Sequence, residues 1–344
     1  MSQRSGVPGG LAAGSRIALL YDELLGETPD LLDGEVQRQA IAQALIELGH
    51  EPIPIPCDLD LAAARERLRQ CEPALVFNLV ESLGGSDRLM PLATLLLESL
   101  GLPYTGCPTA AIVATNDKPA SKRRMRELGL PTPACRRLSG REAKSFALEA
   151  MRFPAEMIIK SVAEHASVGL DDASVVTVDS EAELAALLDE RSRSAGRELF
   201  AETYVRGREF NLSLLDGRAL PPAEIVFENY PEGKPRIVGY AAKWVEASPE
   251  YDGTPRTFEF SSDDGPLLER LCRIAEACWD GFGLAGAARV DFRTDETGEP
   301  WILEVNANPC LNPDGGFAAA CGQAGIGYVD MIGAIVAAGV RPGE

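Results

Sequence analysis

The chain has 344 residues, enough for two or three compact lobes with separate hydrophobic cores. Its 33 basic and 52 acidic residues give a formal net charge of −19. This argues against nucleic acid or a membrane surface as partner, because both demand clustered Lys and Arg. The only histidines, His50 and His165, leave little from which to build a catalytic triad or a histidine metal site. Eight scattered cysteines without a CxxC pair favour reduced thiols in a cytoplasmic protein.

The N-terminal third alternates strand and helix patterns. Residues 1–15 are rich in Gly and Ser and are predicted to be a disordered arm. Residues 16–114 are predicted to form a Rossmann-like lobe with a parallel sheet. Its strands are expected at 16–22, 51–56 and 74–80, and its helices at 34–49, 60–71 and 90–101. Ligands of such sheets bind beyond the carboxyl ends of the strands, which points to 22–23 and 78–81.

The remainder of the chain is predicted to form two α+β lobes, at 115–197 and 198–344. The first opens with a helical segment whose basic cluster, at 122–126, is expected to be a solvated face. The other elements expected in these lobes are strands at 153–162, 173–180 and 198–205, helices at 181–194 and 264–280, and a strand pair at 287–295 and 299–309 joined by a hairpin turn. No run of about 18 apolar residues occurs, so no membrane span is predicted.

The C-terminal strand pair carries candidate metal ligands. Arg289 and Asp291 are two residues apart, and so are Glu304 and Asn306, so each pair shares one face of its strand. A hairpin would bring three oxygen-bearing side chains together beside one arginine, a set that suits Mg²⁺ bound with ATP phosphates. The alternative is a set of ordinary polar residues on an exposed face. The apolar neighbours weigh against it, because buried charges need partners or a metal.

Several separate motifs resemble the ATP-grasp superfamily, and D-alanine–D-alanine ligase in particular. They are "LGLPYTGCPTAAIVATNDKPASK" (100–122), "FPAEMIIKSVAEHASVGL" (153–170) and the strand pair with Arg289-Val-Asp291 and Glu304-Val-Asn306. The resemblance runs from about residue 74 to 335. It implies an ATP-grasp fold, α/β overall, in which the Rossmann-like lobe and two α+β lobes enclose ATP. It also implies ATP and a pair of Mg²⁺ ions as cofactors, with Mn²⁺ as an alternative metal.

Matching positions then imply roles for individual residues. The expected phosphate ligands are three lysines, Lys118, Lys160 and Lys243. The adenine and ribose would be held along one strand by Glu202, Tyr204, Val205 and Glu209. The metal ligands would be Asp291, Glu304 and Asn306. The catalytic residues would be Arg289, for the oxyanion of the tetrahedral intermediate, Ser167, in a loop over the γ-phosphate, and Lys243. The competing interpretation of the lysines and glutamates is that they are ordinary surface charges.

The substrate end departs from the family pattern. The acid that holds the first amino group has no clear equivalent, although Glu27 or Glu35 could substitute, and His165 has no counterpart. Candidate substrate residues at altered positions are Asn78, Glu81, Trp244, Asn308, Cys310 and Gly315. We therefore expect a carboxylate–amine ligase acting on small molecules other than D-alanine plus D-alanine. A cyclising enzyme and a nucleotide-binding protein without turnover are the alternatives. Because the family is often dimeric, a homodimer is also expected.

Overall fold

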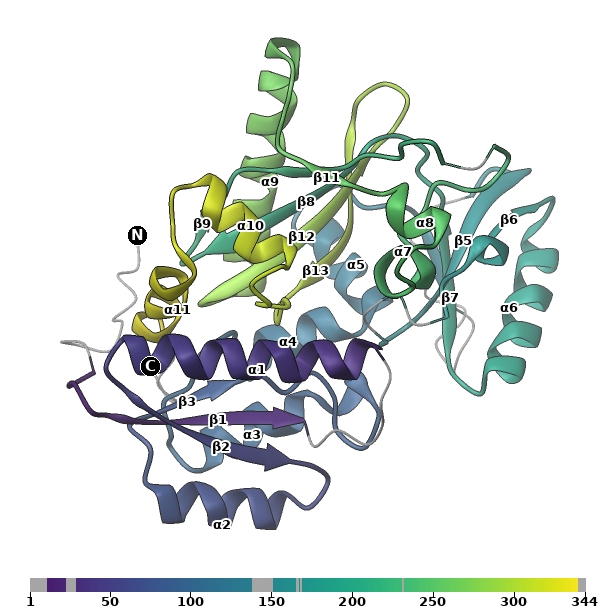
Figure 1. The fold of residues 1–344 in the computed structure, drawn as a ribbon. Coiled ribbons are helices and arrows are strands. Elements are labelled where there is room, and N and C mark those ends of the chain that lie inside the picture. The colour runs from purple at the N-terminus through teal and green to yellow at the C-terminus, as the bar shows by residue number, and fades with distance from the viewer. Residues whose placement is uncertain are drawn as a thin grey trace.

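The computed structural model describes residues 11–22, 29–137, 151–164, 167, 169–230 and 232–339. The described chain forms three β-sheets with helices packed against them. In Figure 1 the N-terminal sheet lies at the bottom, the C-terminal sheet above it, and the central sheet to the right. Short 3-10 turns lie at Asp87–Leu89, Asp172–Ser174 and Ser262–Asp264.

The N-terminal sheet has three parallel strands in the order β2-β1-β3. Its elements are β1 (Arg16–Asp22), α1 (Pro29–Glu47), β2 (Glu51–Cys57), α2 (Leu61–Cys71), β3 (Leu75–Asn78) and α3 (Pro91–Ser99). Alternate residues of β1 enter two cores, because Ile17 packs in a cluster with residues of α1 and Ala18 in a cluster with residues of α2. The predicted parallel sheet with both faces covered is confirmed.

The central sheet is antiparallel, with strand order β4-β7-β5-β6. Its strands are β4 (Cys135–Arg137), β5 (Ala155–Ser161), β6 (Val175–Val178) and β7 (Leu199–Thr203). Ser180 caps the N-terminus of α6 (Glu181–Ala195), whose buried leucines pack on this sheet. Two further helices, α4 (Thr109–Asn116) and α5 (Lys118–Glu127), connect the N-terminal sheet to the central one.

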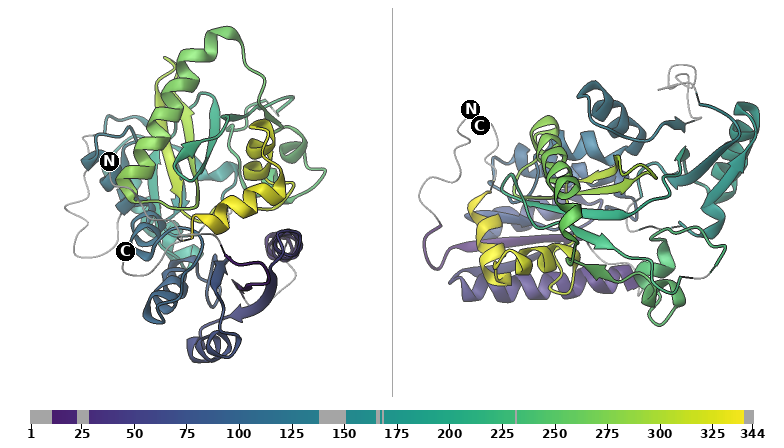
Figure 2. Two further views of the ribbon diagram at one scale, coloured as in Figure 1. Left: turned by 90° about the vertical axis from the view of Figure 1, so that its left-hand side faces the viewer. Right: turned by 90° about the horizontal axis from the view of Figure 1, so that it is seen from above.

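The C-terminal sheet has six strands, in the order β11-β10-β8-β12-β13, with β9 added beside β8. These are β8 (Glu209–Leu215), β9 (Arg218–Ala219), β10 (Ala223–Ile225), β11 (Arg256–Thr257), β12 (Ala287–Thr294) and β13 (Pro300–Asn306). The helices of this region are α7 (Tyr240–Trp244), α8 (Pro249–Asp252), α9 (Gly265–Phe282), α10 (Gly316–Gln323) and α11 (Tyr328–Ala337). Figure 2 shows α9 lying along the sheet, where its apolar stripe joins the largest core.

The structure adds detail to two of the expectations. Residues 1–10 of the predicted arm lie outside the described residues, whereas Gly14 within 11–15 donates its amide to Gly49. Among the described helices, none alone is long and apolar enough to cross a membrane, and only the pair α10 and α11, bent by 101°, meets that criterion together. The boundaries between the three predicted lobes stay a prediction.

Candidate active site

A cavity of about 1360 Å³ lies where the three sheets meet. Residues of all three sheets line it, and among the candidate site residues that the structure describes only Asn78 is missing from its wall. The side chain of Asn78 is instead turned to its own backbone, where it accepts a hydrogen bond from the amide of Val80 at 3.3 Å. His165, Glu23 and Glu27 lie outside the described residues.

The hairpin of β12 and β13 sets the oxygen-bearing side chains opposite one another. In its register Arg289 pairs with Asn306, and Asp291 with Glu304. The Arg289 guanidinium holds Asp291 through two hydrogen bonds, of 2.7 Å and 2.9 Å. Asn211, opposite Asp291 on β8, donates a third at 2.8 Å. Alternation along each strand therefore brings the predicted residues to one face, as expected.

The donor set on this face fits a hard divalent cation. Burial raises the pKa of Asp291 even though Arg289 opposes the shift, so its ionised form gains from added positive charge. The described residues contain no group of three or more His, Cys, Asp or Glu arranged for a metal. A Mg²⁺ ion here would be held by the carboxylates of Asp291 and Glu304 and the side-chain amide oxygen of Asn306. Phosphate oxygens and water would fill the remaining coordination positions, as Mg²⁺ prefers.

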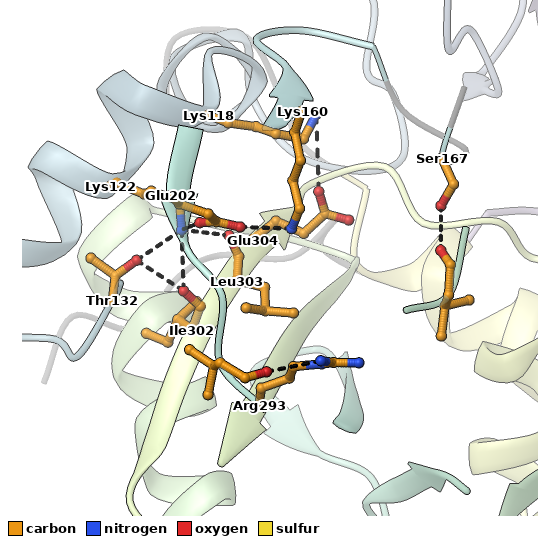
Figure 3. Close-up of polar contacts among 12 residues, drawn as sticks. Lys118, Lys122, Thr132, Lys160, Ser167, Glu202, Arg293, Ile302, Leu303 and Glu304 are labelled. Carbon is orange, nitrogen blue, oxygen red and sulfur yellow. Dashed lines mark hydrogen bonds and ion pairs between the residues drawn. The ribbon is translucent and has the colours of Figure 1, made fainter. Parts of the chain in front are cut away.

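Two predicted phosphate lysines face this hairpin (Figure 3). Lys118 is the first residue of α5, where its ammonium donates to the carbonyl of Glu164 at 2.7 Å and lies 4.0 Å from Glu304. Burial lowers the pKa of Lys118. Lys160, near the end of β5, forms a 2.6 Å ion pair with Glu202. Burial opposes its charge, but the Glu202 carboxylate outweighs burial and raises the pKa of Lys160.

Lys122 corrects one expectation from the sequence. The basic cluster was expected to be a solvated face, yet Lys122 is only 1% exposed and lies 2.5 Å from the Glu202 carboxylate. It also donates to the carbonyl of Leu303 at 2.9 Å and to Thr132 at 3.0 Å (Figure 3). Lys122 lies one turn after Lys118 on α5, on the side facing the sheets, while Arg123 and Arg124 are exposed.

Glu202 consequently sits between two ammonium groups rather than in an open adenine pocket. Its side chain is fully buried, with Lys122 on one carboxylate oxygen and Lys160 on the other. Burial alone would raise the pKa of Glu202, but the two lysines outweigh burial and lower it. The contact of Glu202 with nucleotide therefore stays a prediction, whereas its ion pair with Lys160, a predicted phosphate ligand, is direct.

The segment after β7 is held by an arginine that the sequence analysis missed. Arg293, only 3% exposed, donates two hydrogen bonds to Glu209, at 2.9 Å and 2.8 Å, and one to the carbonyl of Val205 at 2.8 Å. Its guanidinium also lies over the Tyr204 ring, 5.3 Å from the centroid. The signal was available, because Arg293 continues the alternation of Arg289 and Asp291 on β12.

The other two residues predicted to act on phosphate, Lys243 and Ser167, line the same cavity. Lys243 lies on α7, and burial followed by repulsion from Arg289 lowers its pKa. Ser167 has a positive φ of 59° and donates its hydroxyl to the carbonyl of Val238 at 2.9 Å.

At the N-terminal sheet the cavity wall is acidic. The Asp22 carboxylate, at the end of β1, accepts hydrogen bonds from the amides of Glu81 at 2.9 Å and Ser82 at 2.7 Å. Burial raises the pKa of Asp22 to about 6. Burial, with repulsion from Asp22, Asp87 and Asp33, raises the pKa of Glu81 to about 8. The strand ends thus carry the polar residues that a parallel sheet predicts.

The segment after β13 is fixed to the N-terminal sheet and α1. Asn308 donates to the carbonyl of Val80 at 3.1 Å. The Asp33 carboxylate of α1 accepts a hydrogen bond from the Cys310 thiol at 3.4 Å and one from the side-chain amide of Asn312 at 2.6 Å. Gly315 then precedes α10 and contributes no side chain to the cavity. Trp244, at the end of α7, lines the same cavity.

Lysines of strand β5 and helix α5 facing an oxygen-rich hairpin of the C-terminal sheet, beside a parallel sheet, define the ATP-grasp class of enzyme. A family model described as D-ala D-ala ligase C-terminus matches residues 125–337. The D-alanine–D-alanine ligase of Anaeromyxobacter dehalogenans is 31% identical over 92% of this chain and 94% of its own, and that of Pseudomonas entomophila is 30% identical over 94% and 92%. A crystal structure of the Bacillus anthracis ligase with ATP aligns with a TM-score of 0.70 at 21% identity, over 94% of this chain and 97% of that one. The chain belongs to the D-alanine–D-alanine ligase family, ATP-dependent enzymes that form C–N bonds.

Proposed function

We propose that the protein converts a carboxylate into an acyl phosphate with ATP and joins it to an amine, releasing ADP and phosphate. The observation that carries this proposal is the convergence of Lys118, Lys160 and Lys243 on one cavity with Asp291 and Glu304. Phosphoryl transfer depends on positioning and charge neutralisation, and this set of residues supplies both. The ATP-bound Bacillus anthracis relative of the same fold gives independent support.

The position of each residue in the cavity suggests its role. Lys118 and Lys160 would hold phosphate oxygens, while Tyr204, Val205 and Glu209 would hold the nucleoside, with Arg293 fixing the latter two. A bound Mg²⁺, held by Asp291, Glu304 and Asn306, would neutralise charge on the phosphate oxygens. Arg289 would stabilise the oxyanion that forms when the amine attacks the acyl phosphate. Lys243 and Ser167 would cover the transferred phosphoryl group.

We infer that the carboxylate and amine are not both D-alanine. The supporting feature is the wall beyond the hairpin, where Trp244, Cys310 and Gly315 depart from the family pattern while the residues proposed for the nucleotide match it. The Cys310 thiol is not a nucleophile on this proposal, because burial raises its pKa well above the ordinary range.

Phosphate release from ATP and Mg²⁺ tests the proposal, measured over D- and L-amino acids singly and in pairs, with mass spectrometry of the products. We expect release that requires a carboxylate and an amine, and a product at their summed mass minus water. Glu304→Gln should abolish this release, whereas Glu299→Gln on the exposed turn before β13 should not. Release with one substrate alone would indicate cyclisation or self-ligation, which differ in product mass, and ATP binding without release would indicate a protein without turnover.

A further inference from the structure

A single residue, Asp117, separates α4 from α5 and directly precedes Lys118. One oxygen of its carboxylate caps α5 by accepting a hydrogen bond from the amide of Ala120 at 2.9 Å. The other oxygen accepts one from Nη1 of Arg137, on β4, at 2.7 Å. Arg137 does not itself line the cavity. It therefore contacts the start of the helix that carries Lys118, and not the space in which ATP would bind.

A second carboxylate fixes the guanidinium of Arg137. Its Nε and Nη2 atoms donate to the two oxygens of Glu198 at 2.8 Å and 2.7 Å, the paired geometry that orients an arginine most strongly. These hydrogen bonds to Glu198 raise the pKa of Arg137. Arg88, on the 3-10 turn that follows the N-terminal sheet, donates to the same carboxylate at 3.0 Å. The Arg137 side chain is 20% exposed, so solvent and salt screen these contacts less than at an open surface.

Lys118 is held to the same region by its own contacts. Its amide donates to the carbonyl of Val162 at 3.0 Å, and its ammonium to the carbonyl of Glu164 at 2.7 Å. Both acceptors follow β5, and the amide of Val162 donates in turn to the carbonyl of Glu198 at 3.0 Å. One connected set of contacts thus joins the start of α5, the end of β5 and the start of β7. Arg137 bridges the first and the last of these segments.

We propose that Arg137 is a positioning residue for ATP binding, which holds Lys118 at the place where its ammonium meets a phosphate oxygen. The inference rests on the proposed function, in which Lys118 is a phosphate ligand. A lysine that is already in place before ATP arrives loses little freedom on binding. Without Arg137 the Asp117 carboxylate could still cap α5, but the start of the helix would no longer be tied to the segment before β7. The competing interpretation is an ion pair that stabilises the fold and has no effect on the site.

The neighbouring arginine on β4 provides a matched control. Arg136 points to the opposite face of the strand, where its Nε lies 2.7 Å from the carboxylate of Glu181 in α6. The two arginine side chains are similarly exposed, 17% for Arg136 and 20% for Arg137, and neither lines the cavity. Arg136→Gln therefore removes an ion pair of the same kind from the same strand, on the face turned away from Arg137.

The test measures the Kd of MgATP by isothermal titration calorimetry, which requires no turnover. Arg137→Gln should weaken binding by about 10-fold, the lower end of the range for losing a residue that orients a metal ligand. Arg136→Gln should leave the Kd unchanged. Arg137→Lys keeps the charge without the paired hydrogen bonds and should restore part of the affinity. Asp117→Asn can still cap α5 through its amide oxygen, yet should weaken binding as Arg137→Gln does.

A double-mutant cycle with Lys118 separates positioning from general destabilisation. In the Lys118→Ala background, Arg137→Gln should weaken MgATP binding no further, because the lysine that it positions is gone. An equal loss in both backgrounds, wild-type affinity in Arg137→Gln, or wild-type affinity in Lys118→Ala would each overturn the inference. The expected pattern of binding without phosphate release on any substrate would contradict the proposed function and leave the inference standing.

Discussion

The buried ammonium of Lys122 connects two sheets of the protein. It joins Glu202 of the central sheet to the backbone of β13 in the C-terminal sheet, with Thr132 completing its hydrogen bonds. Such a charge is tolerated in the interior because every donor has a partner. Its removal leaves Glu202 with only Lys160 to balance a fully buried carboxylate.

Replacing Lys122 by Met should therefore lower the free energy of unfolding by about 3 kcal/mol, the cost of breaking a buried ion pair. Urea unfolding followed by circular dichroism measures this loss. Arg124→Met, on the exposed side of the same helix, should change stability by no more than about 0.5 kcal/mol. A loss for Lys122→Met as small as that of the control would show that the buried pair contributes little.

Glu81 should make stability depend on pH. Below its ordinary pKa of 4.5 the carboxyl is protonated in the folded and unfolded chains alike, so it has no effect. Between pH 4.5 and about 8 the unfolded chain ionises while the folded chain keeps the proton, so stability falls as pH rises. Above about 8 the loss is complete and constant.

Glu81→Gln should remove this part of the decline, which urea unfolding at a series of pH values would measure. Ionisation of Asp22 also lowers stability as pH rises, between pH 3.8 and about 6, and this effect remains in the variant. Glu66→Gln on the exposed face of α2 serves as the control. Identical pH profiles for the wild type and Glu81→Gln would contradict the assignment.

At the scale of elements, the turn between β7 and β8 positions the proposed nucleoside residues. Gly207 lies in this turn, and a Cβ there would be 2.2 Å from the carbonyl oxygen of Thr294. The Thr294 amide also donates to the carbonyl of Arg208, and the Arg208 amide donates to the Thr294 hydroxyl, so the two segments cannot simply separate. The glycine is required by close approach of β12.

Gly207→Ala should consequently destabilise the protein by about 1–3 kcal/mol, as overpacking does, and should raise the KM of ATP. Gly322→Ala, at an open position on α10, is the matched control and should be neutral or slightly stabilising. Thermal unfolding and ATP titration measure both effects. A wild-type KM for ATP in Gly207→Ala would separate this turn from nucleotide binding.

The elements also show why sequence reasoning succeeded in some places and failed in others. Alternation with period two places Arg289, Asp291, Glu304 and Asn306 on one face, and a hairpin then brings them together, so this face was predictable. Lys122 was not, because a basic run in a helix does not reveal which lysine turns toward a buried carboxylate from another sheet. The position of Arg137 was equally hidden, since β4 is only three residues long and takes its place from β7.

For the whole molecule, eight free cysteines and no disulfide imply a fold that does not depend on oxidation. Burial raises the pKa of Cys57 and Cys278 to about 12, and of Cys135 and Cys321 to about 11. These thiols are accordingly protonated near neutral pH and poorly nucleophilic.

We expect the midpoint of thermal unfolding to be the same with and without dithiothreitol. Modification of these four buried thiols by a thiol reagent should be slow in the folded protein and complete in guanidinium chloride. Rapid modification of buried cysteines under native conditions would indicate local opening of the cores that contain them.

The helix α5 carries Lys118 at its first residue and Lys122 one turn later. Because a helix is stiff over one turn, the spacing between these two ammonium groups is set when the chain folds. Lys122 in turn is tied to the carbonyl of Leu303, immediately before Glu304. The distance between a proposed phosphate lysine and a proposed metal ligand is thus largely preorganised. Little of the binding energy of ATP would then be needed to rearrange this part of the protein. The remainder would be available to stabilise the reacting groups.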